Sequence, residues 1–491
     1  MNLTTIKPSV LCISAVDPMG MSGIHADLRA LESMNVHGAS CITATTAQNQ
    51  NGFQQLNSVS NEAFKSQLDA LHDQDIFSVI KIGLLANADQ VRILLDHPIF
   101  QNKQVVLDPV LSATAGEIEA HEDRLGAIQL LLPFVTVLTP NVNEAKQLLN
   151  SNELDSQALA NDLLKLKAFS VLIKGGHSSN PSRDFYTEGE VAFYLEHNEF
   201  NHEYSRGTGC TMASLIAGAL ALGSTTGDAV TMAKMQMARG WQQAFSIDSK
   251  TGTLGLSPWQ DSMKYEVGSD LFVNLPQVFR YESNKQLNFP RCERPLGLYP
   301  IFDRAEWLER ILPLGIRIAQ IRIKDLEGDL LKQEIQKAVD IAKQYDCQLF
   351  INDYWQLAIE CGAYGVHLGQ EDIDDADLKA ISDAGLRLGL SSHCFYEVAR
   401  AKTINPSYIA FGPVYETQTK DMPWIPQGPQ GLHYWRAHLP EMPMVAIGGI
   451  HGDRFTAVKE TGVDSIAMIT AITLADDPEQ ATRDYIQLFE S

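Results

Sequence analysis

The sequence has no apolar run that approaches the roughly 20 residues needed to span a membrane. Its N-terminal stretch, MNLTTIKPSVLCISAVDP, carries one lysine and a short apolar segment. This segment leads directly into a strand, a turn and a helix, which is not the organisation of a signal peptide. The sequence therefore predicts no membrane partner.

Cysteine is also scarce. The seven cysteines are odd in number and scattered, and no two of them form a CxxC pair. A disulfide framework is typically built from an even set of regularly spaced cysteines. We therefore expect reduced thiols and a cytoplasmic protein.

Basic residues are outnumbered, since 38 Lys and Arg stand against 60 Asp and Glu and give a net charge of −22. Such a chain is not expected to bind nucleic acid or an anionic membrane. An anionic substrate must therefore be bound by local basic clusters rather than by the overall field.

The chain of 491 residues is too long for one hydrophobic core and should form two or three domains. In the first half, short apolar strands alternate with amphipathic segments, which predicts a mostly parallel α/β sheet covered by helices on both faces. The expected strands are 9–15, 39–46, 79–82, 105–107, 135–138 and 171–173, followed by a hairpin between 184 and 203. The glycine-containing turn 17–23 precedes a helix over 24–34 and suits a ligand that approaches backbone N–H groups.

A second glycine turn, Gly207-Thr208-Gly209, stands directly before a long helix of small residues. Backbone N–H groups at such a helix start can bind a phosphoryl group. Cys210 falls in the first helical turn, where a thiolate is electrostatically favoured. The same pattern is also typical of an ordinary turn followed by a buried cysteine.

Three further polar residues follow expected strands. Asn141 and Glu144 can organise metal and phosphate, or they can form an N-cap with an ordinary first-turn glutamate. Lys174, in the segment IKGGH, can reach a nucleotide phosphate or a neighbouring carboxylate.

These segments carry a family resemblance. DPMGMSGIHADL, TATTAQNQNG, KIGLL, LDPV, TPNVNEA, IKGGH and GTGCT appear in the order and spacing of hydroxymethylpyrimidine and phosphomethylpyrimidine kinase, so the first 255 or so residues resemble this ribokinase-like family. The resemblance implies a doubly wound α/β sandwich. It also implies Mg²⁺-dependent transfer of the ATP γ-phosphoryl group to 4-amino-5-hydroxymethyl-2-methylpyrimidine and then to its monophosphate.

The resemblance also implies roles for individual residues. It places the pyrimidine near Ala15, Asp27, Gln48 and Leu84. It makes Gly207, Thr208 and Gly209 the anion hole, with Cys210 at the position of the catalytic base. Nucleotide and phosphate contacts are expected from Asn141, Glu144, Lys174 and Arg206.

The first turn departs from the family pattern. Ala15, Met19, Met21 and His25 replace Gly, Ser, Gly and Gln. Methionine adds bulk where the backbone should approach a ligand, and this suggests a kinase altered in rate or specificity. Arg206 stands before the GTG turn where the family commonly has His, and it either clamps a phosphate or is simply solvated.

Between residues 259 and 296 the strand–helix pattern lapses into a stretch with proline and aromatic residues. We expect an ordered connector that docks on one or both domains. From residue 297 the pattern returns as eight strand-plus-helix modules, which predicts a compact (β/α)₈ TIM barrel over 297–491. The expected strands are 297–301, 318–323, 348–351, 365–368, 387–390, 408–411, 444–447 and 465–468, with helices that include 304–312 and 330–345.

The segment QIRIKD is the most informative part of this half. Gln320, Arg322 and Lys324 alternate with two isoleucines, so a strand would place all three polar side chains on one face. Burying them costs several kcal/mol unless an anion meets them. The alternative is an exposed strand with a solvated basic face.

Other polar residues follow the strands in the same way, at the end of a barrel where active sites lie. Asp353 and Asp372 stand among basic residues, which suits Mg²⁺ held by few carboxylates and by diphosphate oxygens. Gly448 and Gly449, after the seventh strand, are typical of a phosphate pocket in such barrels.

This half resembles thiamine phosphate synthase over 298–490, through QIRIKD, FINDYW, GVHLGQED, LGLSSH, ETQTK, AIGGI and MITAI. The resemblance implies coupling of hydroxymethylpyrimidine diphosphate to hydroxyethylthiazole phosphate with release of diphosphate. It assigns the pyrimidine diphosphate to Gln320, Arg322, Lys324, Asn352, Ser391 and Lys420. It assigns Mg²⁺ to Asp353 and Asp372, and the thiazole phosphate to Thr417, Thr419, Gly449, Ile469 and Thr470.

The chemistry needs electrostatic stabilisation of the leaving diphosphate and no general base, because the thiazole nitrogen already has a lone pair. His367 and His393 can be read as proton-transfer groups. Because histidines commonly satisfy buried hydrogen bonds, we interpret them instead as structural residues or as residues that support the ligand-binding ones.

The sequence leaves three hypotheses open. The first is a bifunctional enzyme in which a kinase domain over 1–258 makes the substrate of a synthase domain over 297–491. The second is a synthase fused to a non-catalytic pyrimidine-binding module, which Met19 and Met21 favour. The third is a tautomerase-like barrel, which the complete set of diphosphate-binding residues disfavours. ATP and small-molecule substrates are the expected partners, and self-association is common among relatives of both halves.

Overall fold

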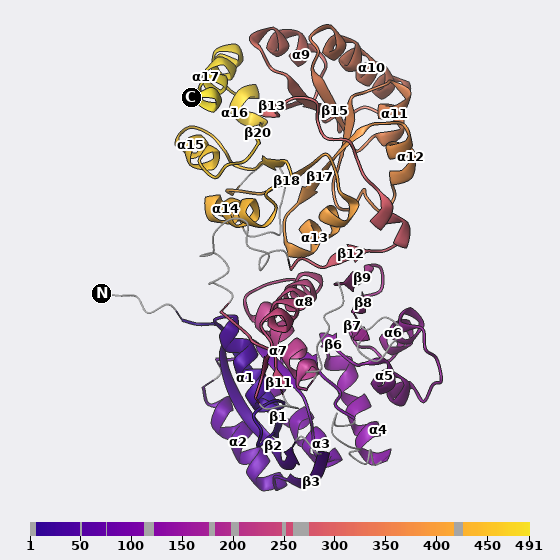
Figure 1. Ribbon diagram of the computed structural model, residues 1–491, viewed down its shortest axis with the longest axis vertical. Coiled ribbons are helices and arrows are strands. Elements are labelled where there is room, and N and C mark those ends of the chain that lie inside the picture. The colour runs from indigo at the N-terminus through magenta and orange to yellow at the C-terminus, as the bar shows by residue number, and fades with distance from the viewer. Residues whose placement is uncertain are drawn as a thin grey trace, which may run out of the picture. The chain divides into compact units, whose positions relative to one another are not determined.

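The computed structural model describes residues 6–49, 52–74, 76–111, 122–175, 182–197, 206–247, 252–258, 274–416 and 426–491. The described residues divide into two compact units (Figure 1). The first contains those up to 258 together with 274–280, and the second contains those from 281 onward. Among the described helices, none combines the length and apolar character required to cross a membrane.

The first unit is built on one sheet in the order β12-β9-β8-β7-β6-β5-β4-β1-β2-β3. Strands β7, β6, β5, β4, β1 and β2 are parallel. Their bounds are β1 Ser9–Val16, β2 His37–Asn49, β4 Val79–Ile82, β5 Gln104–Leu107, β6 Val137–Leu138 and β7 Ser170–Ile173. The chain leaves β1 for β2 on one side and returns to β4 on the other, so the two sides of the sheet are wound in opposite directions. This is the doubly wound α/β sandwich that the sequence predicts.

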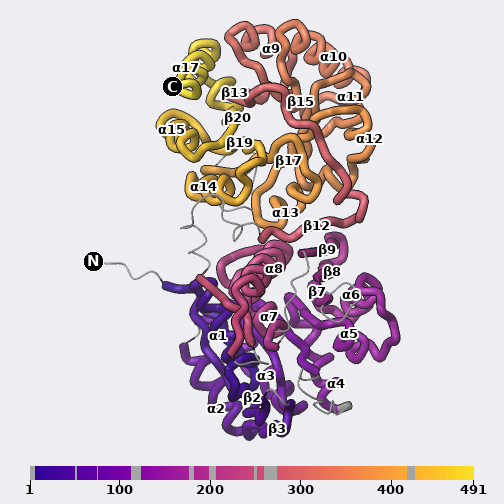
Figure 2. The backbone as a smooth tube through the Cα atoms, in the orientation of Figure 1, coloured from indigo at the N-terminus to yellow at the C-terminus, as the bar shows by residue number. Residues whose placement is uncertain are grey.

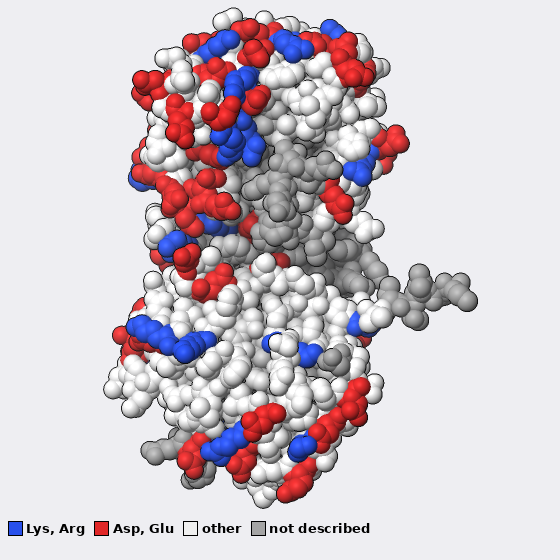
Figure 3. All heavy atoms as spheres, turned by 180° about the vertical axis from the view of Figure 1, so that it is seen from behind, with Lys and Arg blue, Asp and Glu red and all other residues white. Residues whose placement is uncertain are grey.

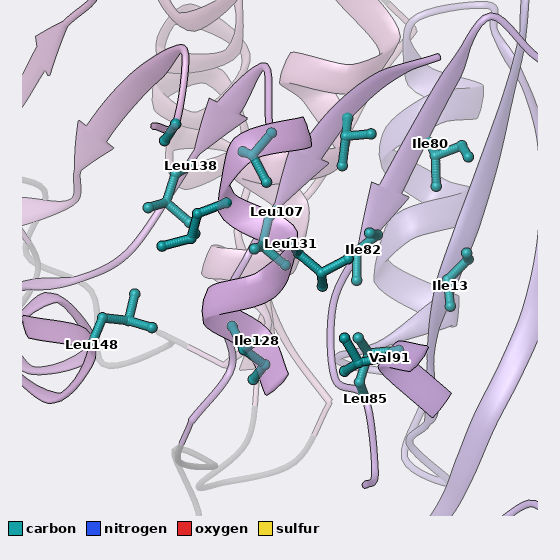
Figure 4. Close-up of a cluster of buried hydrophobic side chains, with 14 of the residues drawn as sticks. Ile13, Ile80, Ile82, Leu85, Val91, Leu107, Ile128, Leu131, Leu138 and Leu148 are labelled. Carbon is teal, nitrogen blue, oxygen red and sulfur yellow. The ribbon is translucent and has the colours of Figure 1, made fainter. Parts of the chain in front are cut away.

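Helices cover both faces of this sheet. They are α1 Ile24–Ser33, α2 Asn61–His72, α3 Ala88–Asp96, α4 Glu122–Leu131, α5 Val142–Leu149, α6 Ser156–Lys165, α7 Thr208–Ala221 and α8 Thr226–Gln242. On one face, side chains of α2 to α6 form a large apolar core with alternate residues of the strands. Figure 4 shows Ile13, Ile80, Ile82 and Leu107 of the strands together with Leu131 of α4 in this cluster. The other face is covered by α1 and α7.

The antiparallel strands extend this sheet at its edges. The predicted hairpin is present as β8 Arg183–Thr187 and β9 Ala192–Glu196. Two strands of this sheet were not predicted, namely β3 Gly52–Ser58, which pairs with β2, and β12 Gln277–Phe279, which pairs with β9. Strand β12 lies in the expected connector, so part of that stretch belongs to the first sheet.

The second unit is a closed parallel barrel of strands β13 to β20, which confirms the predicted (β/α)₈ architecture. Figure 2 traces the backbone of the barrel in chain order. The strands are β13 Gly297–Phe302, β14 Ile318–Ile321, β15 Gln348–Asn352, β16 Gly365–Leu368, β17 Arg387–Ser392, β18 Tyr408–Phe411, β19 Met444–Ala446 and β20 Ser465–Met468. The helices around it are α9 Glu306–Ile311, α10 Gly328–Gln344, α11 Trp355–Glu360, α12 Leu378–Asp383, α13 Phe395–Ile404, α14 Gly428–His438, α15 Asp453–Lys459, α16 Thr470–Thr473 and α17 Pro478–Glu490.

Strand β14 is shorter than predicted. It ends at Ile321, so Arg322 and Lys324 lie beyond the strand rather than on it. The alternation nevertheless continues, because Ile323 is buried while Arg322 is half-buried and Lys324 is exposed. The N–H of Arg322 still donates to the carbonyl of Phe302 at 2.7 Å, which holds the backbone near its strand course.

Residues 288–296 are ordered against the end of the barrel where its strands begin. The Ser407 hydroxyl, just before β18, donates to the carbonyl of Pro290 at 2.6 Å, and Arg291 donates to the carbonyl of Pro406. Cys292 packs against the apolar cluster inside the barrel. This arrangement leaves the opposite end of the barrel for the polar residues.

Acidic and basic side chains are interspersed on the face of the molecule seen in Figure 3. The net negative charge is therefore distributed with local basic positions rather than as one acidic surface on that face.

Candidate active sites

In the first unit, the turn after β1 is organised by Asp17, whose side chain is buried. Its carboxylate accepts hydrogen bonds from the N–H of Met19 at 2.9 Å and from the hydroxyl of Ser22 at 2.8 Å. It also lies 3.3 Å from Arg206, which donates in addition to the carbonyl of Asn49. Arg206 is thus anchored in the structure rather than simply solvated.

The turn meets the GTG segment backbone to backbone. Gly207 has a φ of 77°, and a Cβ on it would lie 1.9 Å from the carbonyl oxygen of Met21. Only glycine permits this approach. Met21 itself is buried, and together with Met19 it lines a cavity of about 700 Å³ beside α1.

Beneath this turn lies a fully buried ion pair. The Nζ atom of Lys81, on β4, lies 2.7 Å from a carboxylate oxygen of Asp27, on α1, and neither side chain has solvent contact. The hydroxyl of Ser214, on α7, donates to the same oxygen at 2.8 Å. Burial raises the pKa of Asp27. Burial by itself would lower the pKa of Lys81, but the nearby negative charges, led by Asp27, raise it above its usual value.

A second ionic cluster lies where β5, β6 and β7 end. The Nζ atom of Lys174 lies 2.7 Å from Asp108 and 3.9 Å from Glu144. A Cβ on Gly209 would lie 3.2 Å from this Nζ and 3.4 Å from an Asp108 oxygen. The ionic cluster and the start of α7 therefore meet at one point.

Asn141 and Glu144 form a reciprocal capping box at the start of α5. The N–H of Glu144 donates to the Asn141 side chain at 2.9 Å, and the N–H of Asn141 donates to the Glu144 carboxylate at 2.8 Å. This realises the capping alternative left open by the sequence. Burial, only partly offset by Lys174, raises the pKa of Glu144 to about 7.

Cys210 occupies the first turn of α7 and is half-buried. The helix start was expected to favour its thiolate, but the pKa of the thiol is raised to about 11. Desolvation outweighs the positive charge of Lys81 and a backbone hydrogen bond from Gly23. The resting side chain at neutral pH is therefore a thiol.

The residues expected around the pyrimidine are partly brought together. Ala15 and Leu84 share a small buried apolar cluster with Ala44. Gln48 lies further along β2, opposite Phe53 of β3. Asp27 forms the ion pair with Lys81, and Lys81 lies on β4, the strand next to the β1 strand that carries Ala15.

The polar end of the barrel contains the predicted carboxylates. Lys324 donates to Asp353 at 2.6 Å. Asp353 has a φ of 64°, which aspartate adopts more readily than most residues, and its N–H donates to the carbonyl of His367. The Asp372 carboxyl lies within hydrogen-bond reach of Asp353, and its pKa is raised by burial and by the charge of Asp353.

Asp353 and Asp372 fit a bound Mg²⁺. Two adjacent carboxylates of like charge, one with a raised pKa, favour a cation between them. Among the described residues, no group of three or more His, Cys, Asp or Glu is arranged for a metal ion. A pair is sufficient for Mg²⁺, which commonly keeps water and substrate phosphate oxygens as its other ligands.

Neutral polar residues lie just inside this end of the barrel. Asn352, at the end of β15, and Gln320 are buried, whereas Ser391 is half-buried. His367 contacts the Ser391 hydroxyl, and burial lowers its pKa to about 4. His393 bonds to Glu397 at 2.7 Å. Both histidines have internal hydrogen-bond partners, as expected of structural residues.

The predicted thiazole phosphate pocket is only partly described. Gly449 has a φ of 66°, and a Cβ there would lie 2.5 Å from the carbonyl oxygen of Glu416, so glycine is required. Ile469 precedes the short helix α16, which begins at Thr470. Thr417, Thr419 and Lys420 lie outside the described residues.

Sequence reasoning missed four residues at these sites. Lys81 and Asp108 lie within the motifs KIGLL and LDPV, and a lysine inside an otherwise apolar four-residue strand was a usable signal. Tyr299 and Tyr408 point into the barrel and meet there, 2.8 Å apart through their hydroxyl oxygens. No sequence signal identifies that contact, because the two strands are far apart in the chain.

Comparison with known proteins finds a matching family for each half of the chain. The family model for phosphomethylpyrimidine kinase matches residues 17–255, and the model for thiamine monophosphate synthase matches residues 298–472. The thiamine-phosphate synthase of Serratia proteamaculans is 53% identical over 202 residues, which are 41% of this chain and 95% of that protein.

Among solved structures, the ADP complex of Bacillus subtilis pyridoxal kinase is 27% identical and covers 52% of this chain and 99% of its own, with a TM-score of 0.48. Thiamine phosphate pyrophosphorylase from Pyrococcus furiosus is 30% identical and covers 40% of this chain and 96% of its own, with a TM-score of 0.36. By the two family models and the Serratia relative, the chain belongs to the thiamine-phosphate synthase family through its C-terminal half, which is fused to a phosphomethylpyrimidine kinase domain in a bifunctional transferase of thiamine biosynthesis.

Proposed function

We propose that the first unit transfers the γ-phosphoryl group of ATP to 4-amino-5-hydroxymethyl-2-methylpyrimidine and then to its monophosphate. The observation that carries this proposal is the meeting of Lys174, Asp108 and Gly209 at the start of α7. A helix N-terminus beside a lysine provides the donors that stabilise a phosphoryl group in transfer.

Each residue of this site has a proposed role. The N–H groups of Gly207, Thr208 and Gly209 bind the moving phosphoryl group, and Lys174 leaves Asp108 to bind a phosphate oxygen. Cys210, in its thiolate form, accepts the proton of the attacking hydroxyl group and becomes a thiol. Its pKa of about 11 makes the thiolate scarce at neutral pH but strongly basic. Ala15 and Leu84 pack against the pyrimidine, with Gln48 and Asp27 at its edge.

The anchored Arg206 fits a role in binding phosphate at this site. Its guanidinium is held by Asp17 and Asn49 beside the GTG segment, where it can compensate for the histidine that the family has there. Met21 is buried and lines the neighbouring cavity together with Met19, so the fold has room for its bulk. These contacts support a working kinase over a binding module.

For the barrel, we propose coupling of the resulting diphosphate with hydroxyethylthiazole phosphate to give thiamine phosphate. The observation that carries this is the grouping of Lys324, Asp353 and Asp372 at the mouth of the barrel. Arg322, Lys324 and Lys420 bind the leaving diphosphate, while Gln320, Asn352 and Ser391 hold the pyrimidine. Thr417, Thr419, Gly449, Ile469 and Thr470 receive the thiazole phosphate.

Mg²⁺, held by Asp353 and Asp372 in the barrel and by Asp108, Asn141 or Glu144 in the first unit, would neutralise phosphate charge as it develops. With the ion present, Asp353 would help to hold it, and Lys324 would be available to bind the diphosphate in place of Asp353. The residues thus need only change partners when substrate binds.

The scarce basic charge and the seven free cysteines are consistent with small-molecule substrates and a reducing, cytoplasmic setting. ATP is the proposed co-substrate, and neither nucleic acid nor membrane is a proposed partner.

Phosphorus NMR of two separate reactions tests these proposals. With ATP and the free pyrimidine alcohol, the expected products are the monophosphate and then the diphosphate. With supplied diphosphate and thiazole phosphate, the expected products are thiamine phosphate and inorganic diphosphate. Failure of the first reaction while the second proceeds would favour the non-catalytic module instead.

A further inference from the structure

The interior of the barrel contains one continuous chain of hydrogen bonds below the mouth. Gln320 Nε2 donates to the Tyr299 hydroxyl at 3.2 Å, and the hydroxyl oxygens of Tyr299 and Tyr408 lie 2.8 Å apart. Tyr408 then contacts His367 Nδ1 at 2.9 Å, and His367 Nε2 contacts the Ser391 hydroxyl at 2.9 Å. The chain thus begins and ends at two residues proposed to bind the pyrimidine.

The barrel is shaped to hold this chain. Its five members come from five strands, namely β13, β14, β16, β17 and β18, and all except Ser391 are buried. His367, Gly389 and Tyr408 are paired across neighbouring strands at one level. A Cβ on Gly389 would lie 2.3 Å from the Tyr408 hydroxyl, so glycine is needed for the tyrosine to reach the centre. The Tyr408 ring also stacks on the imidazole of His367.

The protons of this chain can be assigned by counting donors. Each tyrosine has one proton to donate, and neutral imidazole has one protonated and one unprotonated nitrogen. Tyr299 accepts from Gln320, so it donates to Tyr408, and Tyr408 donates to His367 Nδ1. The imidazole proton is then on Nε2 and points to the Ser391 oxygen. The proton of Ser391 is left for a ligand in the mouth.

Along the hydrogen bonds of this chain, one other self-consistent arrangement exists. If the Gln320 amide turned so that its oxygen accepted from Tyr299, every proton along the chain would reverse. Ser391 would then donate to His367 and offer only its oxygen to a ligand. Mixed arrangements leave a buried donor without an acceptor, which costs free energy. The orientation of Gln320 and the proton of Ser391 are therefore coupled.

We propose that Tyr299, Tyr408 and His367 are positioning residues that make the barrel select an aminopyrimidine. The proposal rests on the proposed function, in which Gln320 and Ser391 contact the pyrimidine diphosphate. With its nitrogen committed to Tyr299, Gln320 presents its oxygen to a ring amino group, and Ser391 donates to an acceptor on the same substrate. A ring with an oxo group in place of the amino group demands the reverse arrangement and loses the Ser391 donor.

The kinetic test uses Tyr299→Phe and Tyr408→Phe in the full chain, with Tyr364→Phe as the matched control. The control substitution also removes a tyrosine hydroxyl with two hydrogen bonds, to Gln348 and to the N–H of Glu293, but at the other end of the barrel. Each chain variant should raise KM for the pyrimidine diphosphate about tenfold with a smaller change in kcat, because one buried hydrogen bond is worth about that much. The control should leave KM unchanged.

The double variant sharpens the result. Because either substitution breaks the same chain, Tyr299→Phe and Tyr408→Phe together should be no worse than the more severe single variant. The preference for the amino over the oxo substrate analogue should fall about tenfold in each of the three proteins. Effects that multiply, or an unchanged preference, would overturn the proposal.

Nitrogen NMR of histidine-labelled protein provides a readout that does not depend on substrate. His367 should be protonated at Nε2 in the free enzyme and should become a mixture of tautomers in Tyr408→Phe. A free enzyme with the proton on Nδ1 would contradict the assigned direction. Ser391→Ala, assayed alone, tests the proposed substrate contact, so a failure of the proposed function is distinguishable from a failure of the chain.

Discussion

In the first unit, Lys81 and Asp27 form an ion pair with no solvent contact at all, whereas Lys324 in the barrel keeps 52% of its side chain exposed beside Asp353. The buried pair is fixed by helices on one face of the sheet and by Ser214. The exposed pair lies at the open end of the barrel, where a partner can be exchanged. The first unit therefore holds this ion pair as part of its folded core, whereas the barrel holds its pair where either partner can be exchanged.

The largest expected effect comes from breaking the buried pair. Lys81→Met leaves Asp27 as an uncompensated buried carboxyl group, which should lower the free energy of unfolding of the first unit by about 3 to 5 kcal/mol. Urea unfolding followed by hydrogen exchange of peptides from the first unit measures this change. Peptides of the barrel provide an internal reference.

Lys65→Met is the matched control, because Lys65 forms an exposed pair with Asp69 one helical turn away. It should leave unfolding of the first unit unchanged within error. Equal losses in the two variants would show that burial does not set the importance of the charge.

The second largest effect is a pH-dependent change in the stability of the first unit. It arises from Glu144, whose pKa of about 7 lies above that of an exposed glutamate. The folded protein therefore holds this proton more tightly than the unfolded chain, and the stability it contributes is present at low pH and lost as pH rises through about 7. Glu144→Gln should stabilise the first unit by about 3 kcal/mol at pH 8 and hardly at all near pH 4.

Unfolding titrations at several pH values, in buffer without divalent metal, measure this difference. A gain from Glu144→Gln that is the same at every pH would argue against a raised pKa.

The third effect concerns the metal site of the barrel. Asp372→Asn should raise the Mg²⁺ concentration required for half-maximal synthase activity by at least about tenfold, because even outer partners of a metal ligand are worth that much. Asp375→Asn, in the same loop but exposed, is the control. Titration of synthase activity with Mg²⁺ measures this concentration for both variants. The same Mg²⁺ requirement in the two variants would contradict the assignment of Asp372 to the metal site.

The smallest effect on stability is expected from Lys324→Met. This side chain is half exposed, so its loss should change the free energy of unfolding of the barrel by less than about 1 kcal/mol. Synthase activity should nevertheless fall, because Lys324 is proposed to bind the leaving diphosphate. A large loss of stability would place Lys324 with the buried pairs of the first unit and remove the contrast between the halves.

The sequence predicted both fold classes because strand–helix alternation is a local pattern that survives into the structure. It also left two alternatives open for Lys174, a nucleotide phosphate or a carboxylate, and two for Asn141 and Glu144, a metal and phosphate site or a helix cap. The structure shows the carboxylate contact and the cap. Part of what it missed depends on contacts between distant segments. Strand β12 joins β9 across a long separation, and the Tyr299–Tyr408 contact joins the first and sixth barrel strands.

The reactivity of Cys210 shows the same limit. Its place in the first helical turn is a local feature and favours the thiolate, but the pKa depends on how much water the surrounding side chains exclude. Desolvation reverses the direction expected from the helix alone. Likewise, the end of β14 at Ile321 is set by the barrel geometry and not by the alternation of QIRIKD.

The most direct test is a one-vessel reaction of the intact chain with the free pyrimidine alcohol, ATP, Mg²⁺ and thiazole phosphate. A bifunctional enzyme should form thiamine phosphate from these substrates. Cys210→Ala should reduce this by about 100-fold or more, in line with the loss of a catalytic base. The same variant should still form thiamine phosphate from supplied diphosphate at the normal rate. Thiamine phosphate that forms only from supplied diphosphate, with or without the substitution, would contradict a kinase in the first unit.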